Sequence, residues 1–334
     1  MDIWYLLWLQ SLRQAAGPLV ESIFVFISAL AINPVTMLLP CVLYWAFDKK
    51  NGLRVLLTFL ACNWVNQMIK VTVCAYRPWI RDARIQVAAG ALKDATGYSF
   101  PSGHTTMAVS VYGTLGLLYQ KRSSLLKWVC WIFVALTAFS RNFLGCHTPQ
   151  DVIVALIEAS LLVFLVGKAI DRFEQAGSPA KKVLWVVLAV NTAGLLFNYF
   201  KPYPMDYLNG QLLVDPVLMQ KDSFEACGMI YGAVLGWYLE RKYVGYTCEG
   251  LTAKTRGIRI LIGILLGGGT YVLGKIALSS LELRLGAMLR YGLLFFVLMY
   301  VVPLVFTALE RRNHVSEPLV LSRSEEKEPA SVNN

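Results

Sequence analysis

Three short clusters in the sequence contain the residue types that phosphoryl transfer needs. They are Lys70-x6-Arg77-Pro78, Pro101-Ser102-Gly103-His104 and Ser140-Arg141-x5-His147-x3-Asp151. Phosphoryl transfer depends mainly on positioning the phosphate and neutralising its charge, while other groups attack phosphorus and move protons. The clusters together supply three cations, two histidines and one carboxylate for these tasks.

The cations of these clusters are suited to holding a phosphate. Lys70 and Arg77 are seven residues apart, about two helical turns, so we expect both to face one site from a helix that Pro78 ends. Arg141 adds a planar guanidinium that can bond two phosphate oxygens at once. The expected phosphate site therefore combines side chains from two separate segments.

The middle cluster is predicted to hold the anion through its backbone. Ser102 and Gly103 precede a predicted helix, where free backbone N–H groups and the helix dipole favour negative charge. Glycine also permits close approach of the backbone to a ligand. His104, beside this helix start, could protonate a departing alkoxide and later deprotonate a water molecule.

The last cluster is predicted to provide the nucleophile. His147 and Asp151 are four residues apart, on one helical face if the helix begins near His147. The carboxylate would then hold one ring N–H and leave the other nitrogen free to attack phosphorus. We find no set of ligands with divalent-metal spacing, so we expect turnover without metal or other cofactor.

The composition indicates that these residues are positioned by a membrane protein. Of the 334 residues, 56% are hydrophobic and only 16% are charged. Apolar runs, several of them long enough to cross a bilayer, follow one another and indicate an all-α, multi-pass transmembrane bundle of about nine spans. The predicted spans are 35–47, 53–74, 104–120, 126–143, 150–169, 182–199, 223–240, 257–278 and 285–308. Charged residues this close to a bilayer usually mark function.

The basic residues predict the orientation of the chain. The net charge of +10 arises from lysines and arginines in short loops between spans, as membrane orientation requires, so we expect no nucleic-acid partner. Loops on one side, with the tail, carry 19 basic residues, and those on the other carry nine. The excess places the C-terminus in the cytoplasm and all three clusters on the outer or lumenal side.

The predicted spans divide the chain into four parts. Residues 1–34 are predicted to form an amphipathic interfacial helix over 3–15 and an interfacial or re-entrant segment over 17–33. Residues 35–170 form the part that carries all three clusters, and 171–310 contribute additional transmembrane helices. Residues 311–334 are mostly polar and are predicted to be a disordered tail.

The three clusters resemble the signature motifs of the type 2 phosphatidic acid phosphatase superfamily, in order and with the family's spacing. This resemblance implies a six-helix phosphatase core and a phosphohistidine intermediate. It implies that His147 is the nucleophile, His104 the general acid and Asp151 the orienting carboxylate. It also implies that the phosphate is bound by Lys70, Arg77, Ser102, Gly103 and Arg141. The nine spans are similar in layout to glucose-6-phosphatase and sphingosine-1-phosphate phosphatase.

The expected function is hydrolysis of lipid phosphate monoesters or diphosphates in the plasma or endoplasmic reticulum membrane. Membrane lipids are the expected partners, and the sequence does not indicate an oligomeric state. Three alternatives remain open: a phosphatase of a soluble sugar phosphate, a lipid phosphotransferase, and a protein that binds or transports lipid phosphates without cleavage. The complete His147–Asp151 pair argues against the last.

Overall fold

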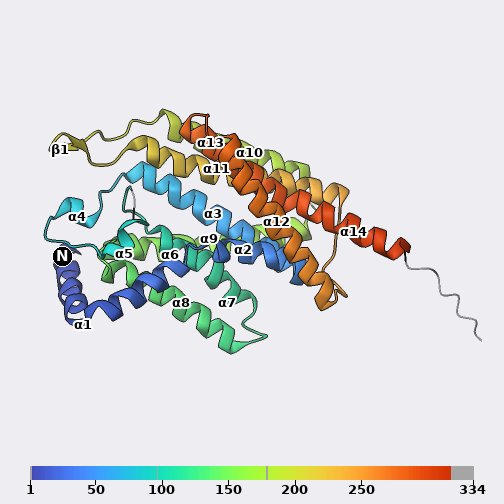
Figure 1. Cartoon of the computed structure of the whole chain (residues 1–334), viewed down its shortest axis with the longest axis horizontal. Helices are drawn as coiled ribbons and strands as arrows, with labels where there is room; N and C mark the ends of the chain where they lie inside the picture. The colour runs from blue at the N-terminus through green and yellow to red at the C-terminus, as the bar shows by residue number, and fades with distance from the viewer. Residues whose placement is uncertain (1, 96, 178–179, 317–334) are drawn as a thin grey trace, which may run out of the picture.

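The protein is built from helices that run back and forth through most of the chain (Figure 1). A computed structural model describes residues 2–95, 97–177 and 180–316. Within these residues the only strands are the two-residue β1 and β2, which pair antiparallel: Tyr207–Leu208 and Gln211–Leu212. The predicted all-α, multi-pass fold is therefore confirmed.

The helices follow one another with short connections. Those up to the third cluster are α1 Asp2–Leu30, α2 Pro34–Val42, α3 Lys49–Val73, α4 Pro78–Arg81, α5 Ala89–Leu92, α6 Gly103–Ala108, α7 Thr114–Leu118, α8 Ser124–Phe143 and α9 Pro149–Gln175. The later helices are α10 Ala180–Phe200, α11 Pro216–Tyr243, α12 Ala253–Ala277, α13 Leu283–Phe296 and α14 Val302–Ser316. Three π-helical turns extend α2 and join α6 to α7 and α13 to α14: Leu43–Phe47, Val109–Gly113 and Val297–Val301.

Each predicted span overlaps one helix or one set of joined helices. In the described part of the chain, six stretches are long and apolar enough to cross a bilayer. They are Asp2–Phe47, Ser124–Phe143, Pro149–Gln175, Ala180–Phe200, Ala253–Ala277 and Leu283–Arg312. With this content of apolar helices, the chain is an integral membrane protein.

The N-terminal region is helical on both sides of a kink. Helix α1 runs from Asp2 to Leu30, and the kink lies where the two predicted segments meet, because Gly17 takes a left-handed conformation (φ 82°) and Pro18 follows it. Glycine adopts this conformation without steric cost, and proline suits the first turn of the second half. The second half packs on α8, where the rings of Phe24 and Phe143 lie 4.6 Å apart.

The helices form two groups on either side of α3. In Figure 1, α1 and α8 lie on one side of α3, whereas α10, α11 and α13 lie on the other. Helix α3 contacts α6 and α9 on the first side and α11 on the second. Thus α3, which carries Lys70, is packed between the helices beside the second and third clusters and the C-terminal helices.

The C-terminal group is held by close contact between α11 and α13. A Cβ atom added to Gly232 would lie 1.9 Å from the backbone oxygen of Gly292, and one added to Gly228 would lie 2.2 Å from that of Met288. Small residues at this spacing let two backbones approach, as in many membrane proteins.

The predicted tail begins later than expected. Helix α14 continues to Ser316, and near its middle Glu310 pairs with Arg259 of α12 at 2.7 Å. Residues 311–316 are therefore helical. Residues 317–334, the rest of the predicted tail, lie outside the described residues.

Candidate active site

The three clusters meet at one end of the helical bundle. The residues come from the C-terminal ends of α3 and α8, the N-terminal ends of α6 and α9, and the loops beside them. Their polar side chains are no more than 7% exposed: Lys70, Arg77, Ser102, His104, Arg141, His147 and Asp151. Burial of so many charged groups is costly unless they face one another or a ligand.

His147 is fixed by the loop that joins α8 to α9. Its backbone N–H donates to the carbonyl of Arg141 (3.2 Å), and the N–H of Cys146 donates to the same carbonyl (3.0 Å). The side-chain amide of Asn142 donates to the carbonyl of His147 at 2.8 Å. These bonds fold the loop back on the end of α8 and hold the imidazole next to Arg141.

Asp151 approaches His147 for a reason other than the predicted helical face. Helix α9 begins at Pro149, so His147 lies before the helix and Asp151 is in its first turn. The carboxylate and the hydroxyl of Thr148 form a reciprocal capping box, in which the N–H of Thr148 donates to Oδ2 of Asp151 at 2.7 Å. The capping box, rather than helical periodicity, places Oδ2 of Asp151 3.4 Å from Nδ1 of His147.

Ser99 links this carboxylate to the loop before α6. Its hydroxyl donates to Oδ2 of Asp151 at 2.5 Å and lies 3.4 Å from Nδ1 of His147. The N–H of Ser102 donates to the backbone carbonyl of Asp151 at 3.0 Å. The second and third clusters are thus joined directly through both side chain and backbone.

Arg77 reaches the site from a loop rather than from α3. The predicted continuous helix is wrong here, because α3 ends at Val73 and Cys74 takes a left-handed conformation (φ 52°). Arg77 then caps the short helix α4, in an extended conformation that its position before Pro78 favours. Lys70 and Arg77 still converge, but a turn brings them together.

The Arg77 guanidinium bonds Gly97, Cys146 and His147 at the centre of the site. Its Nε donates to the carbonyl of Gly97 (3.1 Å), and one terminal nitrogen donates to the carbonyl of Cys146 (3.1 Å). The same nitrogen lies 2.8 Å from Nε2 of His147. Burial lowers the pKa of Arg77 to about 10, so the group stays charged at neutral pH.

This contact assigns the tautomer of His147. A guanidinium can only donate hydrogen bonds, so Nε2 of His147 must accept and carries no proton. The proton of the neutral ring then lies on Nδ1, toward Asp151 and Ser99. Burial, and next the charges of Arg77, Arg141 and Lys70, hold the pKa of His147 well below its usual value of 6.5. The ring is therefore neutral at physiological pH.

Lys70 and the start of α6 lie on another side of the candidate site. The Lys70 ammonium donates to the carbonyls of Pro101 (2.9 Å) and Tyr98 (3.3 Å). Helix α6 begins at Gly103, one residue before the predicted start, and Ser102 is its N-cap residue. Lys70 thus anchors the loop whose end presents the first N–H groups of α6.

Several buried side-chain nitrogens around this point have no hydrogen-bond partner among the described residues. They are Nε and one terminal nitrogen of Arg141, together with Nε2 of His104. The other terminal nitrogen of Arg141 donates to the hydroxyl of Ser28 in α1 at 2.6 Å. Buried polar groups are usually paired, so these atoms identify a place where an anion can bind.

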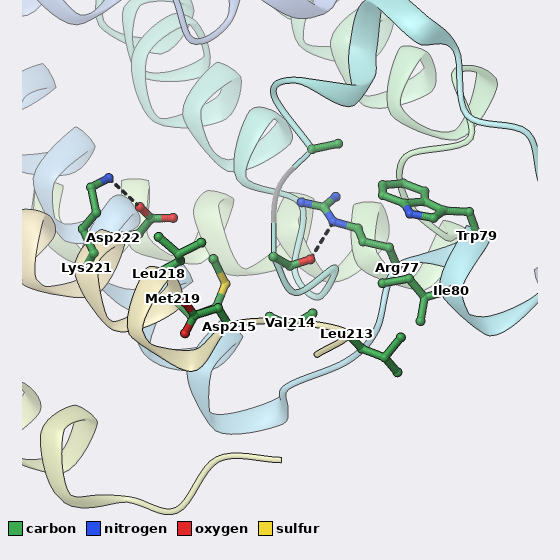
Figure 2. Close-up of a pocket in the computed structure, with 12 residues that line it drawn as sticks. Arg77, Trp79, Ile80, Leu213, Val214, Asp215, Leu218, Met219, Lys221 and Asp222 are labelled. Atoms are coloured by element: carbon green, nitrogen blue, oxygen red, sulfur yellow. Dashed lines mark hydrogen bonds and ion pairs between the residues drawn. The ribbon is translucent and has the colours of Figure 1, made fainter. Parts of the chain in front are cut away.

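A cavity of about 430 Å³ adjoins the site at Arg77 (Figure 2). Trp79 and Ile80 lie on one side of it, and Lys221 and Asp222 of α11 lie on the other. Apolar residues supply most of the remaining wall: Ala95, Leu213, Val214, Leu218 and Met219. The cavity is therefore bounded jointly by the cluster-bearing segment and by the C-terminal helices.

Sequence reasoning missed three residues that contribute to this arrangement. Ser99 precedes the second cluster by two residues, and Ser28 is one of three serines in the largely apolar helix α1, so neither forms a recognisable motif. The sulfur of Met219 accepts a hydrogen bond from the N–H of Tyr98 at 3.3 Å. Only the fold brings Met219 next to a loop 121 residues away.

No group of three histidine, cysteine, aspartate or glutamate side chains with metal-binding geometry occurs among the residues that the structure describes. Metal independence remains a prediction for direct test with a chelator.

The chain matches known families over two segments. Residues 51–174 match the family model of the PAP2 superfamily, and residues 224–314 match that of the PAP2 superfamily phosphatase transmembrane extension. Undecaprenyl-diphosphatase BcrC of Bacillus subtilis is 31% identical over 149 residues, which cover 43% of this chain and 72% of that protein. The chain belongs to the PAP2 superfamily. The family that the three clusters resemble is thereby confirmed.

Two further relatives within the PAP2 superfamily match over shorter shares of their length. Phosphatidylglycerophosphatase B of Bacillus subtilis is 29% identical over 37% of this chain and 62% of its own length. Lipid phosphate phosphatase delta of Arabidopsis thaliana is 29% identical over 50% of this chain and 42% of its own length. No solved structure matches this PAP2 protein significantly.

Proposed function

We propose that this PAP2 protein hydrolyses the terminal phosphate of lipid phosphate monoesters or diphosphates, with His147 as the nucleophile. The observation that carries the proposal is the arrangement around Nε2 of His147. This unprotonated nitrogen faces Arg77, while Arg141 and His104 direct unpartnered donors into the same buried region. The names of the relatives, which include an undecaprenyl-diphosphatase and a lipid phosphate phosphatase, support a lipid substrate.

In the first step of the proposed mechanism, Nε2 of His147 forms a bond to phosphorus as the bond to the leaving oxygen breaks. Arg77 transfers its hydrogen bond from Nε2 to a phosphate oxygen, so the nitrogen lone pair becomes available. Asp151 and Ser99 hold Nδ1–H and stabilise the positive charge that develops on the ring. Arg141 and the first N–H groups of α6 neutralise the phosphate oxygens.

In the second step, water replaces the histidine on phosphorus. His104 protonates the leaving oxygen in the first step and takes a proton from water in the second, which restores both histidines. Phosphate leaves and Arg77 returns to Nε2. These two reaction steps need no oxidant, reductant or additional cofactor.

The cavity next to Arg77 favours a lipid over a sugar phosphate. Its wall contains Trp79, Ile80 and Leu218, which suit an alkyl or isoprenoid chain better than the hydroxyl groups of a sugar. We therefore expect the non-phosphate part of the substrate to lie between α4 and α11. By the distribution of basic residues, we also propose that this end of the bundle faces the outer or lumenal side.

Phosphate release by the purified full-length protein tests the proposal. We expect release in EDTA from at least one of phosphatidate, a sphingoid-base phosphate, phosphatidylglycerophosphate and an isoprenyl diphosphate, and little from glucose 6-phosphate. Substitution His147→Ala should reduce turnover by about 10³-fold or more, because the nucleophile is lost. His314→Ala, which changes the only histidine outside the motifs, is the matched control.

The intermediate distinguishes this mechanism from its alternatives. Acid-labile phosphate should be trapped on wild-type protein during turnover and be absent from His147→Ala. Transfer of phosphate to an added lipid alcohol in preference to water would identify a phosphotransferase. Binding of lipid phosphates without release of phosphate from any substrate would contradict the enzymatic proposal.

A further inference from the structure

A second, smaller cavity lies at the same end of the bundle, among the C-terminal helices. Its volume is about 120 Å³, and α11, α12 and α13 each contribute a cation to its wall: Lys221, Lys275 and Arg290. The other lining residues are small or apolar apart from Ser279, and none of those described is acidic. Three cations around a cavity of this size are suited to binding a single anionic group.

Two of the cations are positioned by an acid that lies outside the cavity wall. Oε1 of Glu225 is 3.1 Å from Nζ of Lys221 and 3.2 Å from a terminal nitrogen of Arg290. The Arg290 guanidinium also lies over the rings of Tyr271 and Tyr291, at 5.6 and 5.2 Å. These contacts hold both side chains in place at the cavity wall.

The fixed cations retain capacity for another partner. Nε of Arg290 is buried and has no hydrogen-bond partner among the described residues. Glu225 and Asp222 neutralise part of the charge, since Asp222 lies 3.4 Å from Lys221, but three cations still face two carboxylates. The cavity therefore keeps an excess of positive charge and an unused donor.

The surroundings of Lys275 indicate where the ligand comes from. Lys275 is exposed, and its neighbours on α12, Leu273 and Ile276, are each 67% exposed apolar residues. Such side chains on a membrane helix contact lipid chains. A cation between exposed alkyl groups and a polar cavity can bind a headgroup while the lipid chain lies along the helix.

Lys221 connects this cavity to the candidate active site. It lines both the 120 Å³ cavity and the 430 Å³ cavity that contains Arg77, whereas Asp222 lines only the larger one. An anion bound to Lys221 would weaken the pairing of Lys221 with Asp222 and so alter one wall of the larger cavity. The two cavities are thus neighbours that share a side chain.

We propose that α11, α12 and α13 form a second anion-binding site, which takes the phosphate group of a membrane phospholipid through Lys221, Lys275 and Arg290. The site lies in the segment that matches the transmembrane extension and does not include any residue of the three motifs. Binding at this second site does not require turnover at His147. Its ligand is bound rather than cleaved, because no nucleophile or proton donor of the proposed mechanism lines the cavity.

Binding of a short-chain phosphatidylglycerol to the full-length protein in a phosphate-free neutral detergent tests this site. Phosphatidylglycerol is a phosphate diester, so it lacks the terminal phosphate that the proposed reaction at His147 removes. We expect Lys275→Met to weaken binding by about fivefold, as loss of one cation near a lipid headgroup predicts. Lys275→Arg should restore it, and Lys93→Met, which removes an exposed cation elsewhere, should bind as wild type does.

Two additional arms separate the possible outcomes. His147→Ala should bind phosphatidylglycerol as wild type does, even if that variant is inactive, so failure of the proposed reaction does not affect this test. If inorganic phosphate binds with the same dependence on Lys275 and the lipid does not, the ligand is free phosphate and the lipid assignment is wrong. Equal binding of the lipid by wild type, Lys275→Met and Arg290→Gln would overturn the site itself.

Discussion

Arg77 and His147 are joined by a 2.8 Å hydrogen bond between a guanidinium nitrogen and Nε2 of the imidazole. The bond keeps the Nε2 lone pair unprotonated, and in the proposed mechanism it directs that lone pair to the phosphate site. The same bond occupies the Arg77 donor, so a bound phosphate and Nε2 of His147 would compete for it. In the proposed mechanism, substrate entry therefore requires Arg77 to exchange one acceptor for another without leaving the site.

The first prediction concerns the shape of the Arg77 side chain. Arg77→Lys keeps the charge but cannot bond Gly97, Cys146 and His147 together, because an ammonium lacks the planar fork. We expect kcat/KM for the best lipid substrate to fall by about 10²-fold, with the protein still folded. Arg81→Lys, which alters a half-exposed arginine in α4, should stay within about twofold of wild type. Comparable activity of the two variants would contradict the role of the guanidinium.

The second prediction concerns Ser99, which we propose positions Asp151 and the His147 ring. Ser99→Ala removes the hydroxyl that donates to Oδ2 of Asp151, so the carboxylate loses a fixed donor. We expect kcat to fall by about tenfold with little change in KM, since the residue does not contact the phosphate in this arrangement. Ser99→Thr should recover most of the activity.

Ser110→Ala is the matched control for Ser99→Ala. Ser110 is also fully buried, but among the described residues its hydroxyl bonds only the carbonyl of Met107 in its own helical segment. Its loss should leave kcat unchanged. If both alanine variants lose activity together with thermal stability, Ser99 has a structural role only.

The third prediction is a pH dependence of stability that arises from His147. Burial and the neighbouring cations hold the pKa of His147 well below 6.5 in the folded protein, whereas the unfolded chain binds a proton near 6.5. Between these values the unfolded state binds more protons, so folding stability decreases as pH falls below 6.5. The decrease for this one group is at most about 1.4 kcal/mol per pH unit.

His147→Gln removes this titrating group and should reduce the loss of stability in acid. The measurement is the difference in Tm between wild type and His147→Gln from about pH 7.5 to about pH 5.5. We expect the difference to shift in favour of the variant as the pH falls. A constant difference would show that the ring is not held neutral by its surroundings.

More of the candidate site residues than of the local structure around them could be predicted from the sequence. Residue types and spacing identified the catalytic candidates, because a charged side chain within an apolar chain has few roles other than function. The predicted local structure at Arg77 and Asp151 was wrong. A left-handed turn at Cys74 and the capping box at Thr148 interrupt the helical periodicity that we expected. Turns and capping boxes depend on the exact positions of backbone and side-chain atoms, which the spacing of residue types does not determine.

The contributions of the C-terminal helices could not be derived from spacing. The stripe Gly228, Gly232 and Gly236 is visible in the sequence, but only the fold shows that it meets α13. Met219 contacts the loop before α6 because α11 packs on α3, a contact between segments far apart in the chain. Such pairings follow from tertiary packing, which a single sequence does not specify.

The last prediction tests whether the backbone at the start of α6 contacts the phosphate. A Cβ added to Gly103 would meet only Oδ1 of Asn66, at the ordinary distance of 3.8 Å, so alanine fits the folded protein without strain. Alanine is also the better helix former, and stability should be unchanged or rise by up to about 1 kcal/mol. Gly103→Ala should nevertheless lower kcat/KM by about 10²-fold, because the new methyl group keeps the phosphate away from the N–H groups. Gly268→Ala, at an open position of α12, is the control, and full activity of Gly103→Ala would place the phosphate elsewhere.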